Sequence, residues 1–411
     1  MGEHAVVYGR PALVAALDLR LTVRISPGAA GAVRLDLPGL DHSEETGWEA
    51  ILSYARAARE RWDAYSREPG PERFRAVRGE DPAHVVKVAL GEVAGDSQEL
   101  PHPEALTPWP PLPPPPTPLT GRGGIRLERS CFSPSSPGEG GGEGAGDEGR
   151  GDEGLGRGNV LGADALPGLA LRVDSQLPIG SGFGSSAATA VGVIAGYLAF
   201  RGAALDPVRI EGLALEVERR QHGLPSGVDS AAVLFGGLLW ARRLPAGGLE
   251  TERLAPASPL LRRLRVIDTG TPPEEPTGAV VAAVRDRRDR DSAGHDRLLD
   301  RIEGATLAFR AQLERPAEDA AVTLELIREC QACLEELGVV PDAVRSLVRR
   351  VAAEGGAAKV SGAGSLAGPG AGSLLIYHPD PERIASWPFL RSFPFHPVHL
   401  GADGLRRETD A

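Results

Sequence analysis

Residues 177–188 read LPIGSGFGSSAA, so three alternating glycines lead directly into a run of small residues. Glycine lets backbone N–H groups approach an anion closely, and the run from Ser185 to Phe200 has the pattern of a tightly packed helix. A helix N-terminus adds unpaired N–H donors and the positive end of the helix dipole. The stretch therefore predicts a phosphate-binding loop and helix, with Ser185 and Ser186 as helix caps and as hydroxyl ligands of phosphate or Mg²⁺.

The spacing of these glycines differs from that of two commoner phosphate-binding loops. Glycines at 180, 182 and 184 do not fit G-x-G-x-x-G, and no lysine follows them as a P-loop requires. A glycine-rich run can also serve only the close packing of a helix. The other motifs of the chain have to decide between these two interpretations.

Length and charge limit the classes of function. A chain of 411 residues is too long for one ordinary core and suits two domains. The formal charge of −11, without a basic stripe, argues against a nucleic-acid or membrane-surface partner and favours a small-molecule substrate. No apolar run reaches the length of a membrane span. Few cysteines and no secretory signal pattern favour a cytoplasmic protein, and the Cys330-x-x-Cys333 pair is interpreted as structural.

The periodicity of the chain predicts a mixture of helices and strands around one insert. From about 97 to 167 the sequence is rich in Pro and Gly and almost free of large apolar residues, which predicts a disordered insert within the first domain. Helices are expected at 48–65, 83–93, 185–200, 208–221, 279–288, 297–313, 317–337 and 341–354. Strands are expected at 169–173, 237–243, 265–268 and 373–377, the last closing the chain, and as two runs within 5–25 around a turn at 9–11.

Four segments together resemble a known family. The sequence PIGSGFGSSAA at 178–188 resembles the P-x-G-x-G-[LF]-G-S-S-A-A motif of the GHMP kinases, which include galactokinase and the homoserine, mevalonate and phosphomevalonate kinases. In the family's order, GEHAVVYG at 2–9, GLPSGVD at 223–229 and KVSGAG at 359–364 resemble motifs of the mevalonate kinase members. The resemblance covers nearly the whole chain outside the insert.

This resemblance implies both a fold and a reaction. It implies an α+β GHMP kinase fold with two domains, a ribosomal protein S5 domain 2-like N-terminal domain at 1–260 and a ferredoxin-like C-terminal domain at 261–411. ATP and substrate would lie between the domains. It also implies transfer of the ATP γ-phosphate to the C5 hydroxyl of mevalonate in isoprenoid biosynthesis, with Mg²⁺ as cofactor. Homodimers are common in the family.

The resemblance also assigns roles to individual residues. Asp229 would be the catalytic base, or would orient the C5 hydroxyl, although an isolated Asp after a turn is usually a cap. Ser186 and Glu218 would bind Mg²⁺, with Glu216 as a competitor if either glutamate is simply part of a charged helix face. The residues expected to bind ATP are Pro178, Gly180, Ser181, Gly182, Phe183, Gly184, Ser185, Ser186, Lys359, Gly362, Ala363 and Gly364.

Three further residues are expected to bind mevalonate. Glu3 and His4 would lie at the mouth of the substrate pocket. Thr269 is the third candidate, although a plain strand-end turn explains it equally well. The segment KVSGAG at 359–364, the third motif of the family, continues into a loop that is longer here than the family pattern, because residues 365–371 precede the next strand. This difference leaves the contacts of the loop open.

The opening motif departs from the family pattern. Mevalonate kinases usually carry a lysine six residues before the glutamate of G-E-H, whereas the sequence here starts two residues before Glu3. The chain has two lysines, Lys87 and Lys359, and neither replaces the missing one. We expect the natural start to lie upstream, because the missing piece would also supply the first strand of the sheet. The alternatives are a phosphomevalonate or homoserine kinase, or a catalytically impaired GHMP-fold binding protein.

Overall fold

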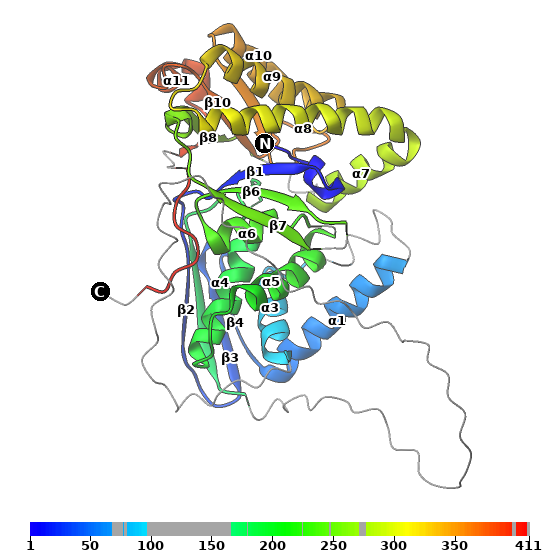
Figure 1. The fold of residues 1–411 in the computed structure, drawn as a ribbon. Coiled ribbons are helices and arrows are strands. Elements are labelled where there is room, and N and C mark those ends of the chain that lie inside the picture. Colours follow the sequence, from blue (N-terminus) through cyan, green and yellow to red (C-terminus); the bar gives the residue numbers. More distant parts are fainter. Residues whose placement is uncertain are drawn as a thin grey trace, which may run out of the picture.

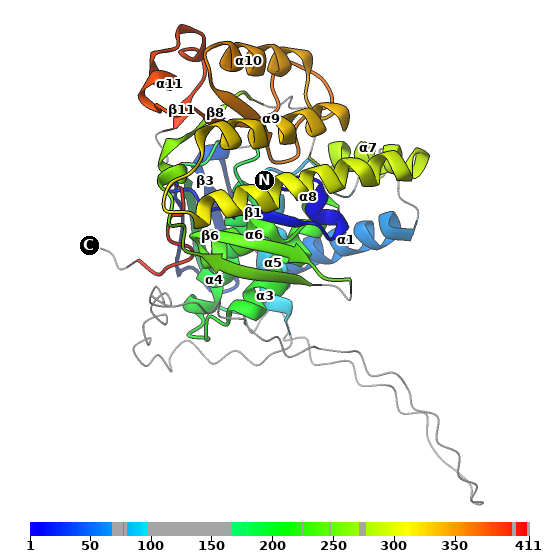
Figure 2. The same cartoon turned by 45° about the horizontal axis from the view of Figure 1, so that its top comes forward.

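The computed structural model describes residues 1–67, 77, 80–96, 166–178, 180–223, 225–245, 248–270, 277–396 and 400–408. Strands within these ranges form three sheets, and the helices pack against and between them (Figures 1 and 2). The expected α+β fold is confirmed. The domain limits at 260 and 261 stay a prediction. The insert expected at 97–167 lies outside the described residues, except that Leu166 is buried and the Pro167 carbonyl accepts the Trp48 indole N–H at 2.8 Å. These two residues belong to the fold, so the predicted end of the insert was wrong.

The first sheet has the order β2-β5-β3-β4, in which β3 and β5 run parallel and the other pairs antiparallel. Its strands are β2 (Leu21–Pro27), β3 (Ala32–Leu37), β4 (His42–Gly47) and β5 (Leu169–Ser175), with η2 (Pro38–Leu40) between β3 and β4. The helices that pack with this sheet are α1 (Trp48–Arg67), α3 (His84–Gly95), α4 (Ser185–Phe200) and α5 (Pro207–His222).

Small residues in α4 explain how closely this helix packs on the sheet. A Cβ atom at Gly192 would lie 2.9 Å from Val23 Cγ2, and one at Gly196 would lie 3.3 Å from Ile25 Cδ1. Both glycines therefore face β2 at a distance that a larger side chain does not fit. This close packing fixes the start of α4, where the glycine loop enters it.

The second sheet has the order β1-β6-β7 and lies between the two larger parts of the molecule (Figure 1). Its strands are β1 (Pro11–Ala15), β6 (Leu238–Arg243) and β7 (Leu249–Leu254). One face carries α6 (Val228–Phe235), and the long helix α8 (Ser292–Glu314) crosses the other side. Buried side chains of β1, α8 and α9 share one cluster, which joins this sheet to the C-terminal half.

The third sheet is antiparallel throughout and has the order β11-β8-β10-β9. Its strands are β8 (Leu264–Asp268), β9 (Ala357–Ser361), β10 (Ser373–Tyr377) and β11 (Phe395–His396). The C-terminal half also contains η5 (Pro259–Arg263), α7 (Thr277–Arg290), α9 (Ala320–Glu336), α10 (Asp342–Ala353), α11 (Glu382–Ser386) and η6 (Pro388–Leu390).

Two of the expected elements near the chain ends were wrong. Residues Ala5–Tyr8 form the 3₁₀-helix η1 instead of a strand, because backbone bonds such as Val6 N–H to Gly2 O at 3.1 Å curl the segment. This compact turn buries Ala5 and Val6 in two different hydrophobic clusters, which overrides the strand preference of the valines. The strand at 373–377 does not close the chain, since α11, η6 and β11 follow it.

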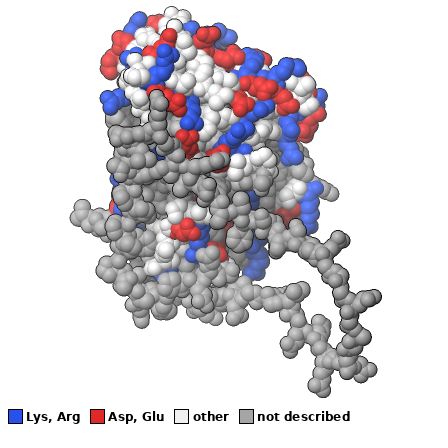
Figure 3. Space-filling view, in the orientation of Figure 1, with Lys and Arg blue, Asp and Glu red and all other residues white. Residues whose placement is uncertain are grey.

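No helix among the described residues is both long and apolar enough to cross a bilayer. Over the upper part of the face in Figure 3, basic and acidic side chains are interspersed. The expectation that no nucleic acid binds stays a prediction.

Candidate active site

The glycine loop has the backbone conformation that its sequence requires. Gly180, Gly182 and Gly184 have φ angles of 77°, 72° and 72°, in the left-handed region that other residues seldom adopt. Gly184 is the N-cap of α4, and no side-chain hydrogen bond caps the helix. The expectation that Ser185 or Ser186 caps α4 was therefore wrong. The first N–H groups of the helix stay available, as an anion site needs.

The two glycine motifs, far apart in sequence, lie against each other. A Cβ atom on Gly362 would be 3.5 Å from the Gly182 carbonyl oxygen, so the third-motif loop touches the first. The Ser181 hydroxyl donates to Asp268 Oδ2 at 2.7 Å, which ties the first loop to β8. The Ser373 hydroxyl donates to the Ser361 carbonyl at 2.8 Å and braces the start of the other loop.

Asp229 lies beside the end of the glycine loop. A Cβ atom on Gly184 would be 3.8 Å from Asp229 Cβ, and Asp229 stands in the first turn of α6 after the turn at 225–227. Its side chain is exposed to a cleft, yet protein surrounds the cleft, and this burial raises the pKa of the carboxyl above its usual value. A carboxylate that binds protons more readily is suited to accept one from an alcohol.

Glu218 and Ser186 form the second polar group of the site. Glu218 is 3% exposed, and its Oε1 atom is buried without a hydrogen-bond partner. The pKa of Glu218 is raised to about 8, and burial is the largest cause of this rise. The charge of Asp229 also raises this pKa, whereas a hydrogen bond with Ser186 lowers it. The Ser186 hydroxyl also lies 2.7 Å from His222 Nε2. Two neighbouring carboxyls with raised pKa values and an orphan oxygen fit a divalent cation, because oxygen ligands of this kind suit Mg²⁺.

Glu216 does not face this group. Its carboxylate pairs with Arg219 and, at 3.2 Å, with Arg220 on the same helix. Of the two glutamates that the sequence left open, Glu218 is the one whose pKa the charge of Asp229 raises.

Glu3 and Lys359 form an ion pair inside the protein. Lys359 on β9 is 0% exposed, and its ammonium group donates to Glu3 Oε1 and, at 2.8 Å, to the Val360 carbonyl. The Ser361 hydroxyl donates to the same Glu3 oxygen at 3.2 Å. Burial raises the pKa of Glu3, but the positive charges of Lys359 and the N-terminus outweigh burial and hold this pKa at about 2. This geometry turns the ammonium of Lys359 toward Glu3, and its expected contact with ATP stays a prediction.

The side chains of His4 and Thr269 both form hydrogen bonds with backbone groups in or near the third motif. His4 Nε2 donates to the Ala363 carbonyl at 2.9 Å, and burial lowers the pKa of this imidazole. The Thr269 hydroxyl donates to the Gly372 carbonyl at 2.7 Å and accepts the Ala371 N–H at 2.9 Å. The Thr269 bonds correspond to a strand-end turn, and its contact with a substrate stays a prediction.

One cleft of about 1750 Å³ unites most of these groups. It is lined by parts of the glycine loop and of the third motif, by the carboxyls of Glu218 and Asp229 and by the opening segment. The expected site residues on its wall are Glu3, His4, Gly180, Gly182, Phe183, Gly184, Ser185, Ser186, Glu218, Asp229, Gly362, Ala363 and Gly364. Pro178, Ser181, Lys359 and Thr269 are not among the lining residues.

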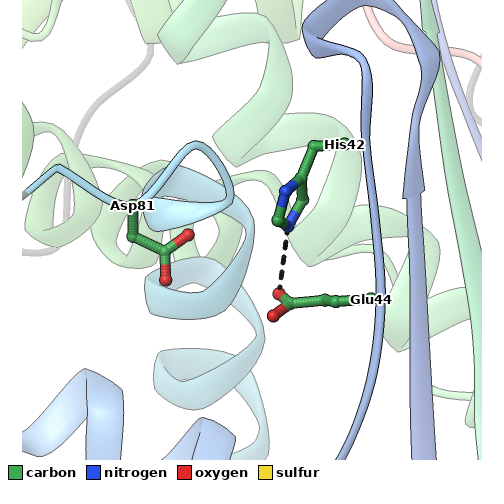
Figure 4. A group of neighbouring side chains, drawn as sticks. All are labelled: His42, Glu44 and Asp81. Carbon is green, nitrogen blue, oxygen red and sulfur yellow. Dashed lines mark ion pairs between the residues drawn. The ribbon is translucent and has the colours of Figure 1, made fainter.

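A second cluster with metal-ligating side chains lies near α3. His42, Glu44 and Asp81 come within reach of one ion (Figure 4). The Lys87 ammonium lies 2.8 Å from Glu44 and 2.7 Å from Asp81, so a cation of the protein itself already pairs with both carboxylates. We interpret this cluster as a structural ion pair.

The comparisons with known proteins agree with this geometry. The family description "GHMP kinases N terminal domain" matches residues 155–237. Mevalonate kinase of Bos taurus is 29% identical over 439 residues, covering 100% of this chain and 92% of that protein. Mevalonate kinase of Homo sapiens is 28% identical, covering 98% of this chain and 91% of that protein. Residues 155–237 therefore match the N-terminal domain of the GHMP kinases, and the chain is similar to mevalonate kinases over nearly its whole length.

A solved structure extends the likeness to the whole fold of the chain. A crystal structure of mevalonate kinase superposes with a TM-score of 0.61 at 16% identity, covering 97% of this chain and 95% of that chain. The fold expected from the motifs is thereby confirmed. The glycine loop, the Asp229 carboxylate and the third-motif loop meet in this chain at one cleft.

The sequence did not point to three residues that organise this site. His222, Asp268 and Ser361 hold Ser186, Ser181 and Glu3, respectively, through side-chain hydrogen bonds. His222 precedes the motif at 223–229, and Ser361 lies inside the motif at 359–364. Asp268 precedes the candidate residue Thr269, and this nearness in sequence was the available signal. Which polar atom each would contact depends on the tertiary fold, because the partners lie 36, 87 and 358 residues away in the chain.

Proposed function

We propose that this protein transfers the γ-phosphoryl group of ATP to the C5 hydroxyl of mevalonate, giving 5-phosphomevalonate and ADP. The observation that carries the proposal is the position of Asp229 beside Gly184, at the point where the glycine loop enters α4. The mevalonate kinases among the full-length relatives support the choice of substrate.

The chemistry follows from these positions. The N–H groups of the loop and of the first turn of α4 hold the triphosphate. The C5 hydroxyl oxygen attacks the γ-phosphorus, its proton passes to the Asp229 carboxylate, and the bond between the γ-phosphorus and the bridging oxygen breaks to release ADP. The raised pKa of Asp229 helps it hold that proton.

The cofactor of the proposal is Mg²⁺. Glu218 and Ser186 are the residues that would hold it, since they combine an orphan carboxylate oxygen with a hydroxyl at the start of α4. When bound, the ion neutralises phosphate charge and so favours the transfer. The contacts of Glu3, His4 and Thr269 with mevalonate, a cytoplasmic location and a homodimer belong to the same proposal.

A coupled assay tests the proposal. Purified protein with Mg-ATP should form ADP when mevalonate is added, and not with phosphomevalonate or homoserine in its place. The Asp229→Asn variant should bind ATP normally but lose about 10²- to 10⁴-fold in turnover, the range expected for a general base. Turnover of homoserine or phosphomevalonate in place of mevalonate would reassign the substrate, and equal rates for the variant would remove Asp229 from the mechanism.

A second candidate is a GHMP-fold protein that binds ATP and mevalonate with little turnover. It is favoured by the two lysines, because Lys359 is paired with Glu3 and Lys87 with Glu44 and Asp81. Neither ammonium group is therefore directed at the reacting hydroxyl. The same assay decides, since the wild-type protein would then bind both ligands but form no ADP above the rate measured without protein.

A further inference from the structure

His222 occupies a central position in the segment that carries the reactive carboxyls. It is the last residue of α5, and Gly223, with φ of 83°, ends the helix and turns the chain toward α6. Glu218 lies one helical turn earlier, and Asp229 follows in the first turn of α6. Residues 218 and 222 share one face of α5, because side chains four apart are neighbours on a helix.

That face points at Ser186. The distance of 2.7 Å between Ser186 Oγ and His222 Nε2 is that of a good hydrogen bond. Ser186 also interacts with Glu218, and both Ser186 and His222 line the cleft. The serine hydroxyl therefore has two acceptors within reach, a carboxylate and an imidazole nitrogen.

A hydroxyl has only one proton to donate and two lone pairs to offer. If a divalent cation is held by Glu218 and Ser186, the Ser186 proton must point away from it, because a metal ion repels the positive end of the O–H bond. The acceptor left for that proton is His222 Nε2. The histidine then carries its own proton on Nδ1 and acts as a neutral acceptor.

We propose that His222 is a positioning residue that accepts the Ser186 hydroxyl proton and so aims an oxygen lone pair at the divalent cation of the bound nucleotide. This inference rests on the proposed kinase function. Partners that orient a metal ligand from behind typically change metal affinity about 10- to 100-fold when they are removed. The competing interpretation is a purely structural one, in which His222 only places basic charge at the C-terminal end of α5 next to Arg219 and Arg220.

The test measures cation binding and needs no turnover. Mn²⁺ replaces Mg²⁺, an unhydrolysable ATP analogue replaces ATP, and the loss of the free Mn²⁺ electron paramagnetic resonance signal gives the affinity. We expect His222→Leu to weaken Mn²⁺ binding to the protein–nucleotide complex about 10- to 100-fold, whereas His222→Gln, whose amide oxygen reaches the same place, largely retains it. Affinity for the nucleotide without metal should stay the same in both variants.

A double-mutant cycle with Ser186→Ala separates positioning from structure. If His222 acts through the serine hydroxyl, His222→Leu has no further effect once that hydroxyl is absent. An unchanged Mn²⁺ affinity in His222→Leu, or an equal loss in the Ser186→Ala background, would overturn the proposal. Should His222→Leu fail to fold, His222→Asn takes its place, since its shorter side chain cannot reach Ser186. Equal affinities of the Asn and Gln variants would then count against the proposal.

The binding of the nucleotide analogue and Mn²⁺ to the wild-type protein shows whether a failure concerns the role of His222 or the proposed function. If it binds the nucleotide analogue and Mn²⁺ and only the variants behave unexpectedly, the role of His222 is wrong and the kinase proposal stands. If the wild type binds neither, the nucleotide site itself is wrong, and the role of His222 falls with it.

Discussion

At the scale of single residues, the site is defined by two carboxyls that hold their protons unusually firmly. Burial raises the pKa of Glu218 to about 8, with the Asp229 charge as the second cause, and burial raises the pKa of Asp229 as well. A raised pKa means that ionising the group in the folded protein costs free energy. Such a pair is poorly stable as two bare anions and is suited to a bound cation.

The pH dependence of stability tests the state of Glu218. The folded pKa of about 8 lies above the usual value of 4.5 for a glutamate, so the folded protein binds an extra proton between these pH values. The free energy of unfolding of the metal-free protein should therefore fall as pH rises from about 5 to 8, by a few kcal/mol at about 1.4 kcal/mol per pKa unit. Denaturant titrations at several pH values measure it.

The Glu218→Gln variant is the control for this pH dependence. Gln has nearly the same shape and no titrating carboxyl, so most of the fall should disappear, leaving the part due to Asp229. A variant whose unfolding free energy falls as steeply as that of the wild type would show that Glu218 is ionised throughout this range.

At the scale of elements, the glycine loop and α4 form one unit. The packing of Gly192 and Gly196 on β2 fixes the helix, and Gly184 joins it to the loop with a left-handed backbone. The unit is rigid on the sheet side and open on the cleft side. A phosphate therefore meets N–H groups that are already oriented.

A single added methyl group tests this arrangement. Gly184→Ala places a Cβ atom 3.8 Å from Asp229 on a residue with φ of 72°. An L-residue in that region costs about 1–2 kcal/mol, so ATP affinity should fall about 10-fold if the loop relaxes away from its conformation. Calorimetric titration with ATP measures the change.

Gly212→Ala in α5 is the matched control. A Cβ atom there meets nothing within 4 Å, and alanine stabilises a helix interior by about 0.5–1 kcal/mol relative to glycine. ATP affinity should stay at the wild-type value while the melting temperature rises. Equal ATP affinities in the two variants would mean that the loop does not bind the phosphates.

The elements also show what the sequence could and could not predict. The helix expected at 185–200 has those bounds in the structure, because a long run of small apolar residues permits few other interpretations. The strand β4 was not expected, because its sequence HSEETG is polar and its stability comes from pairing with β3. The strand β9 was not expected either, because it buries Lys359, whose partner Glu3 lies far away in the chain. Most of the site residues expected from the motifs line the cleft, but Pro178, Ser181, Thr269 and Lys359 do not. The motifs did not predict the Ser181–Asp268 contact, which depends on how the two halves dock.

At the scale of the whole molecule, the opening segment joins the halves. Glu3 and His4 contact Lys359 and Ala363 of the C-terminal half, while β1 pairs with β6 of the second sheet. The contacts of Gly182 with Gly362 and of Ser181 with Asp268 complete the junction. The opening segment and the two glycine loops thus join the two halves of the molecule at the wall of the cleft.

Breaking the buried ion pair should loosen this junction. Lys359→Met leaves the Glu3 carboxylate without its main partner, and removal of one member of a buried pair typically costs about 3–5 kcal/mol. Chemical denaturation should show a loss of this size. The double variant Glu3→Gln/Lys359→Met should recover much of it, since no buried charge is left unpaired. If Lys359→Met were as stable as the wild type, the ion pair between Glu3 and Lys359 would not stabilise the junction.

The central claim is that the cleft transfers phosphate from ATP to the C5 hydroxyl of mevalonate. The most direct test is a ³¹P nuclear magnetic resonance spectrum of the products formed from Mg-ATP and mevalonate labelled with ¹³C at C5. We expect a new phosphomonoester signal coupled to that carbon, together with ADP, and about 10²- to 10⁴-fold slower formation of both products by the Asp229→Asn variant. ADP accompanied by inorganic phosphate alone, or a phosphoester that is not coupled to C5, would contradict the central claim.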